Sequence, residues 1–165
     1  MAPDTFLLTK GKFSVDINYD KPNGSAQVKG VVFDNETDTV VPLGDLRAQL
    51  LSNTAALRFH DGGDFDTTIA LDNCVERGKG IKCKGPAVKA KFRTVSDTEA
   101  VWEVQAKVKG LRVTSTGYAP IEDRLYAQIL QPDEFYQVVR EGSLNSVDHN
   151  CKVARADSLI VCRAN

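Results

Sequence analysis

The sequence predicts an all-β fold, an antiparallel β-sandwich built from two tandem, internally duplicated repeats. Apolar and polar residues alternate along most of the 165-residue chain, which is the periodicity of half-buried strands. Turn-forming residues interrupt these segments about every 8–12 residues, a spacing typical of sandwiches and barrels. One set of sequence features also occurs twice in the same order, which predicts a duplicated unit.

The repeat is clearest in an L-x-A-Q-[LI]-L pattern, found over residues 46–51 and again over residues 125–130. Five further features return in the same order, at shifts of 77 to 80 residues. They are Lys12-Phe13 and Lys91-Phe92, Val28-Lys29-Gly30 and Val108-Lys109-Gly110, Pro42 and Pro120, Asn73-Cys74 and Asn150-Cys151, and residues 81–83 and 160–162.

These matches place repeat 1 at residues 12–85 and repeat 2 at residues 86–165. Residues 1–11 precede them as an N-terminal arm or an extra strand. A repeat of this size buries little apolar surface alone, so we expect the two to pack as one body. Two abutting sandwiches are the alternative.

Strands are expected wherever the alternation runs between two turns, and Asn23-Gly24 is the strongest turn signal. In repeat 1 these segments are residues 13–19, 26–32, 46–50 and 65–71, followed by a hairpin over residues 74–83. In repeat 2 they are residues 88–92, 102–108, 125–130 and 135–139, followed by a hairpin over residues 151–162.

The segment that starts at Leu46 fits two structures. Leu46, Ala48 and Leu50 alternate like a strand, although residues 46–56 also fit a short helix. The equivalent segment of repeat 2 alternates in the same way, and Pro132 follows it at once. This equivalence favours a strand.

The four cysteines form two pairs at equivalent repeat positions, Cys74 with Cys83 and Cys151 with Cys162. Duplicated pairs are typical of disulfides formed in an oxidising compartment. Four cysteines allow three pairings, and four free thiols in a cytosolic protein are the alternative. The first residues carry no basic region and no apolar run of signal-peptide length. We therefore expect a secreted or cell-surface protein whose signal peptide has been removed, with an intracellular protein as the alternative.

Composition and motifs argue against several classes of function. The net charge of −1 gives no overall attraction to nucleic acid, and no apolar run approaches the roughly 18–20 residues that span a bilayer. The two histidines, His60 and His149, occupy non-equivalent positions, and no nucleophile motif or phosphate-binding glycine loop is present. We expect no enzyme, no catalytic residue, no cofactor, no nucleic-acid partner and no membrane span.

A basic stretch over residues 77–93 is a candidate polyanion-binding surface, because it contains seven cations and no acid. Lys107, Lys109 and Arg112 extend it on the following strand. The alternative, preferred from sequence because no aromatic residues interleave, is a solvated strand face that discourages aggregation. The seven cations are Arg77, Lys79, Lys82, Lys84, Lys89, Lys91 and Arg93.

Two further features are candidate sites. Asp61, Asp64 and Asp66 surround two glycines, and hard carboxylate ligands on a tight turn suit Ca²⁺, although their register is not that of an EF-hand. An apolar, strand-prone segment lies before the repeats and is a candidate arm for adding a strand to a neighbouring subunit. Its residues are Thr5, Phe6, Leu7, Leu8 and Thr9.

A resemblance to a known family rests on three segments in a fixed order. They are the cysteine hairpin, the alternating lysine and apolar strand of residues 88–92, and the tryptophan strand of residues 102–107. The chain is similar to cysteine-hairpin β-repeat domains of secreted and surface proteins of bacteria, over residues 12–165. The resemblance implies an extracytoplasmic β-sandwich and no catalytic residues.

The sequence as a whole predicts a non-catalytic, extracellular or cell-surface structural protein. We expect it to act as a subunit of a filament or another extracellular assembly, through its N-terminal strand, with itself or another surface protein as partner. The alternative is a secreted binding module that recognises a glycan or a protein.

Overall fold

The computed structural model describes residues 6–14, 24–33, 45–60, 66–95, 98–111, 124–132, 137–145, 150–154 and 159–163. In this part of the chain the fold is all-β apart from helix α1 (Leu46–Leu51), which confirms the predicted class. No helix there is long and apolar enough to cross a membrane.

The strands form two large antiparallel sheets and one separate hairpin. The six-stranded sheet has the spatial order β1 (Phe6–Ser14), β2 (Gly24–Phe33), β8 (Thr98–Leu111), β7 (Val88–Val95), β6 (Gly80–Lys84) and β5 (Cys74–Arg77). The four-stranded sheet has the order β10 (Gln137–Asn145), β9 (Arg124–Pro132), β3 (Ala56–His60) and β4 (Asp66–Ala70). The hairpin consists of β11 (Asn150–Ala154) and β12 (Leu159–Arg163).

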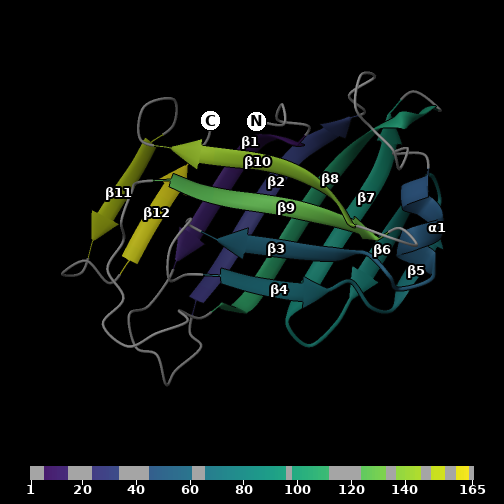
Figure 1. The fold of residues 1–165 in the computed structure, drawn as a ribbon, viewed down its shortest axis with the longest axis horizontal. Helices are drawn as coiled ribbons and strands as arrows, with labels where there is room; N and C mark the ends of the chain where they lie inside the picture. The colour runs from purple at the N-terminus through teal and green to yellow at the C-terminus, as the bar shows by residue number, and fades with distance from the viewer. Residues whose placement is uncertain are drawn as a thin grey trace.

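The core lies between the two large sheets. Figure 1 shows the four-stranded sheet lying over the six-stranded sheet, with the two sets of strands crossing. Alternate strand residues point inward, so Phe92 and Trp102 from one sheet and Phe59 from the other belong to a single cluster of buried side chains. Burying each such side chain stabilises the fold by about 1.5–3 kcal/mol.

Residues 46–51 form α1, so the strand predicted for this segment is wrong. Leu46 and Leu50 are fully buried, whereas Ala48 between them is exposed. Positions i and i+4 share one face of a helix, while a strand would have placed all three side chains on the same side. The matching hexapeptide at residues 125–130 lies in β9, so the same pattern folds as a helix in one place and as a strand in the other.

Buried amide groups fix α1 to the end of β9. The Gln49 side chain donates a hydrogen bond to the Pro132 carbonyl (3.0 Å) and accepts one from the Gln131 amide (2.8 Å). Gln131 in turn accepts a hydrogen bond from Nε of the buried Arg140 guanidinium (2.6 Å). Because α1 also contacts β5 and β6, it joins the two sheets at one edge of the core. These long-range bonds explain why six residues remain helical, since an isolated helix of this length is unstable in water.

At the other edge of the six-stranded sheet, β10 lies directly against β1. Gly142 permits this contact, because a Cβ atom at this position would collide with the carbonyl oxygen of Phe6 and lie 3.2 Å from Cγ of Leu8. The absence of a side chain therefore sets how closely the two sheets approach here.

The strand order of both sheets has an internal regularity. Among the described strands, β1 to β6 precede Gly85-Pro86 and β7 to β12 follow it. The comparison pairs each strand with the strand six places away in the chain, so that β1 corresponds to β7 and β3 to β9. Replacing each label by that of its counterpart turns β1-β2-β8-β7 into the same run read backwards, and it does the same for β10-β9-β3-β4. Hairpin β5–β6 pairs with β7 within the six-stranded sheet, and β12 of hairpin β11–β12 contacts β1 without belonging to that sheet. Under this exchange β9 corresponds to β3 and not to the helical residues 46–51.

The two cysteine pairs lie at directly opposed positions in their hairpins. Cys74 and Cys83 form a disulfide across β5 and β6, which confirms this predicted pair. Closing a loop this short contributes about 2–3 kcal/mol in the chain-entropy model. Cys151 and Cys162 are opposed in the same way across β11 and β12, while their side chains lie outside the described residues.

Candidate functional site

The outward face of the six-stranded sheet carries two rows of lysines that run across the strands. Cys83, Ala90 and Ala106 are paired across β6, β7 and β8 and point into the core, so the residues on either side of each point outward. The first row, from β6 to β2, is Lys82, Lys91, Gln105 and Lys29. The second row is Lys84, Lys89, Lys107 and Gln27. All eight side chains are exposed, and we call this set the lysine face.

An open groove lies between the two rows. It encloses about 340 Å³, with Cys83 and Ala90 at its floor. Its walls are Lys82, Lys91 and Gln105 on one side and Lys84, Lys89 and Lys107 on the other. A second hollow of about 280 Å³ adjoins it, shares Lys89 and Lys107, and extends to Lys109.

The lysine face concentrates positive charge in a chain whose net charge is −1. Lys82 is directly opposite Lys91, and Lys89 is directly opposite both Lys84 and Lys107. Like charges directly opposite one another on a sheet are destabilising. The lysine face is therefore a local cost to stability.

A single acid occurs among the outward side chains that the structure describes on this sheet. It is Glu103, which accepts a hydrogen bond from the Arg93 guanidinium at 3.0 Å. Arg93 and Glu103 are therefore paired with each other, and no hydrogen bond joins Glu103 to a lysine of the lysine face. Among the described residues, no hydrogen bond or ion pair joins an acid to these lysines.

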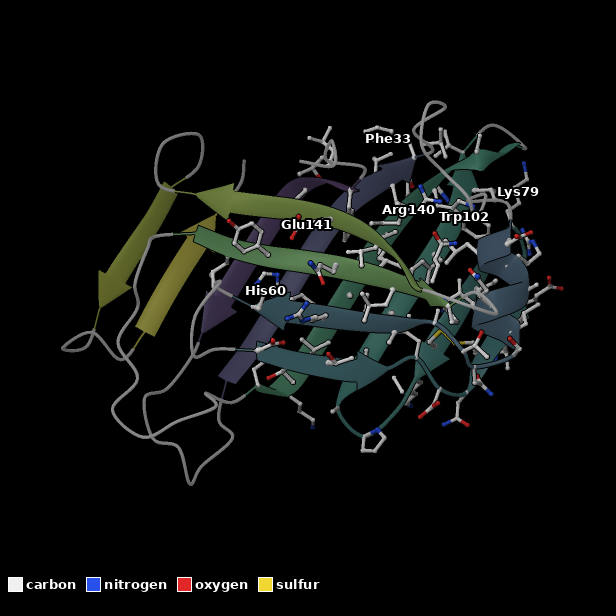
Figure 2. All side chains as sticks on the ribbon, viewed as in Figure 1. Phe33, His60, Lys79, Trp102, Arg140 and Glu141 are labelled. Atoms are coloured by element: carbon white, nitrogen blue, oxygen red, sulfur yellow. A yellow bond between two sulfur atoms is a disulfide. The ribbon has the colours of Figure 1, made fainter. Side chains whose placement is uncertain are left out.

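The outward face of the four-stranded sheet has a different character, because its charges are paired. His60 stacks on Tyr126, with ring centroids 4.7 Å apart, and its Nε2 lies 3.6 Å from Oε1 of Glu141. Figure 2 shows His60 and Glu141 on this sheet, away from the buried Trp102 and Arg140. Arg58 donates to Asp66 from Nε at 2.8 Å.

The hydrogen bond between Arg58 and Asp66 shifts both groups toward their charged forms. It lowers the pKa of Asp66, and it raises the pKa of Arg58. Gln128 donates to Glu141 at 2.9 Å and completes a network that links β3, β4, β9 and β10. This face stabilises the sheet through internal pairs, whereas the lysine face leaves its charges available to a ligand.

The structure brings together most of the predicted basic residues. Lys82, Lys84, Lys89 and Lys91 form the groove. Arg77 lies at the end of the edge strand β5, opposite Gly80, while Lys79 lies in the turn that follows, and Arg112 lies outside the described residues.

Sequence reasoning missed three residues of the lysine face, Gln27, Lys29 and Gln105. Gln27 and Lys29 join the face because β2 pairs with β8, and they lie more than fifty positions before Lys82 in the chain. Their alternation with buried Ala26 and Val28 is the available signal, since it repeats the pattern of residues 88–92.

The remaining predicted sites are described only in part. Asp61 and Asp64 lie outside the described residues, and Asp66 is paired with Arg58. In the part of the chain that the structure describes, no three His, Cys, Asp or Glu residues are grouped to hold a metal ion.

The predicted arm is also described in part. Thr5 lies outside the described residues, and Phe6, Leu7, Leu8 and Thr9 belong to β1. Phe6 and Leu8 are buried in the core, whereas Leu7 is 60% exposed. Thr9 donates a side-chain hydrogen bond to the carbonyl of Lys29 at 3.1 Å. Phe6, Leu7 and Leu8 therefore pair with β2 of their own chain, and Thr9 lies at the register shift that follows them.

Comparison with models of protein families, with curated proteins and with solved structures gives no match to this chain.

Proposed function

We propose that this chain is a non-catalytic, extracytoplasmic binding module whose lysine face binds an acidic polysaccharide. The observation that carries the proposal is the pair of lysine rows, opposed across neighbouring strands in a chain of net charge −1. Their mutual repulsion costs stability, and a bound polyanion offsets it by neutralising the ammonium groups and releasing counterions.

The position of the lysines favours binding over protection against aggregation. Protective lysines are expected on an edge strand, where unpaired backbone groups attract other chains. Lys89 and Lys91 lie on β7, and Lys107 lies on β8, and both strands are paired on both sides. Charges in the middle of a sheet do not cover an edge, so the alternative interpretation explains them less well.

The side chains of the face favour a polysaccharide over single-stranded nucleic acid. Neither row contains an aromatic ring, so bases would find no stacking platform. Lysine supplies compact charges for sulfate or carboxylate groups, and the exposed amides of Gln27 and Gln105 are donors and acceptors suited to hydroxyl groups. The Cys74–Cys83 disulfide supports an oxidising compartment.

We also propose that the fold is a β-sandwich that arose by duplication of a six-strand unit. Support comes from the strand orders, which keep their neighbours when β1–β6 are exchanged for β7–β12. In this proposal hairpin β5–β6 packs beside the first strand of the other repeat, and β12 does the same. Two repeats joined in this way form one body.

The assembly role of residues 5–9 has less support than the lysine face. Phe6 and Leu8 fill the core of their own chain, so exchanging this strand would remove two buried side chains from it. If β1 added to the sheet of a neighbouring subunit instead, its strand pairing and buried side chains would only replace those that it already has in its own chain.

Calorimetric titration of the whole protein with heparin, a sulfated polysaccharide, tests the proposed function. We expect binding at about 50 mM salt that weakens steeply by about 200 mM, with a slope of log affinity against log salt near −4 for six lysines. Uncharged dextran is the control and should not bind. Absence of heparin binding at the lower salt concentration, or equal binding of dextran, would contradict the proposal.

A further inference from the structure

We infer that the ligand of the lysine face is a single extended chain of sulfated polysaccharide that lies across the strands, in the groove between the two rows. The inference rests on the proposed function and adds the direction, the length and the single-chain nature of the ligand.

The dimensions of the groove follow from the pairing of its strands. The two rows are separated by two residues along each strand, which is about 7 Å. Each row extends over β6, β7, β8 and β2, and three intervals between neighbouring strands are about 14 Å. The groove is lined by residues of β6, β7 and β8, and the two rows continue beyond it to Lys29 and Gln27 of β2. The rows are therefore longer across the strands than the space between them is wide.

The charges select this direction for the ligand. A chain that follows the two rows from β6 to β2 passes all six lysines, three on each side. A chain that follows one strand would meet two lysines, which are Lys82 and Lys84 on β6, Lys89 and Lys91 on β7, or Lys107 and Lys109 on β8. Since each neutralised charge adds to the affinity, the transverse path is favoured.

The floor of the groove allows a chain to enter. Between the rows the residues are Cys83, Ala90, Ala106 and Val28, whose side chains are buried in the core. Their backbone is therefore the outward surface, and no side chain from the floor blocks the path. A single extended chain can lie over this floor and contact both rows, whereas a nucleic-acid duplex or a lipid surface would touch only the lysine tips.

Size-defined heparin oligosaccharides, from the disaccharide upward, test the inference with the whole protein. We expect the affinity to rise with length and to level off once the oligosaccharide spans β6 to β2. Lys29→Gln removes a charge at the β2 end of the first row and should weaken long oligosaccharides by about fivefold, the effect of one lysine near an anionic surface. The affinity for the disaccharide should fall less, because a disaccharide can bind near β6 and β7 without contacting Lys29.

Lys109→Gln is the matched control, because it removes the same charge from β8 outside the two rows. We expect it to weaken long oligosaccharides less than Lys29→Gln does. If Lys109→Gln has the equal or larger effect, or if affinity does not depend on length, the transverse path is wrong while heparin binding, and with it the proposed function, remains. Tighter binding of duplex DNA or of anionic lipid vesicles at matched charge would overturn the single-chain ligand. If no heparin binds at all, the proposed function fails first.

Discussion

Replacing Lys82, Lys89 and Lys91 together by glutamine is expected to weaken heparin binding about a hundredfold. Each lysine near an anionic surface contributes about 1 kcal/mol, and these three lie on both walls of the groove. The salt dependence should also become shallower, by about 0.7 units of slope per lysine. Calorimetric titration of the triple variant over a range of salt concentrations measures both effects.

The stability of the same variant distinguishes a binding surface from a structural one. Because Lys82 and Lys89 each face another lysine across the strands, their removal relieves repulsion, and the midpoint of urea unfolding should stay the same or rise. A clear loss of stability would mean that the lysines support the fold.

Net charge is controlled by a second triple variant, Thr68→Glu, Ala70→Glu and Val139→Glu. It lowers the net charge by the same three units, at exposed positions of the four-stranded sheet. We expect only a small loss of heparin affinity. An equal loss in both variants would show that heparin senses the overall charge and not the lysine face.

Replacing Gly142 by alanine is expected to lower the free energy of unfolding by about 3 kcal/mol or more, the upper range for overpacking a core. The new Cβ atom would meet the backbone oxygen of Phe6, and backbone atoms cannot move aside as a flexible side chain does. Either β1 or β10 must shift, which disturbs the contact between the two sheets. Urea denaturation at neutral pH gives the value directly.

Gly85→Ala is the matched control. The Cβ atom added there would lie 3.5 Å from Cγ1 of Val88, an ordinary van der Waals distance, so a change within about 0.5 kcal/mol is expected. If Gly142→Ala is as mild as Gly85→Ala, β10 does not pass against β1 as described.

The sequence was sufficient for the features that depend on local pattern. Period-two alternation predicts most of the strands, although not β3 or most of β1. It also places Lys89, Lys91 and Arg93 on one side of β7. The equivalent placement of the cysteines predicts the Cys74–Cys83 disulfide, because both residues close the same hairpin.

Features that depend on long-range contacts were beyond the sequence pattern. Leu46, Ala48 and Leu50 are apolar in both a strand and a helix, and burial of only the first and last distinguishes the two. That burial comes from packing against the sheets, and the hydrogen bonds of Gln49 to β9 complete it. The repeat favoured the wrong structure here because a shared hexapeptide does not imply a shared position in the fold.

The lysine face shows the same limit for a functional site. The pairing of β2 with β8 adds Lys29 to the lysines of β6, β7 and β8, and it sets the direction of the groove. No local signal specifies which strands become neighbours. The basic stretch was visible in the sequence, whereas the two transverse rows required the sheet.

The most direct test of the account is to locate the ligand by nuclear magnetic resonance on the isotope-labelled protein. Backbone amide signals are followed while a heparin oligosaccharide that spans the groove is added. We predict that the shifted signals come from β6, β7, β8 and β2 around Cys83, Ala90, Ala106 and Val28, and that β3, β4 and β9 are little affected. Shifts centred on the four-stranded sheet, or spread evenly over the protein, would contradict a binding site on the lysine face.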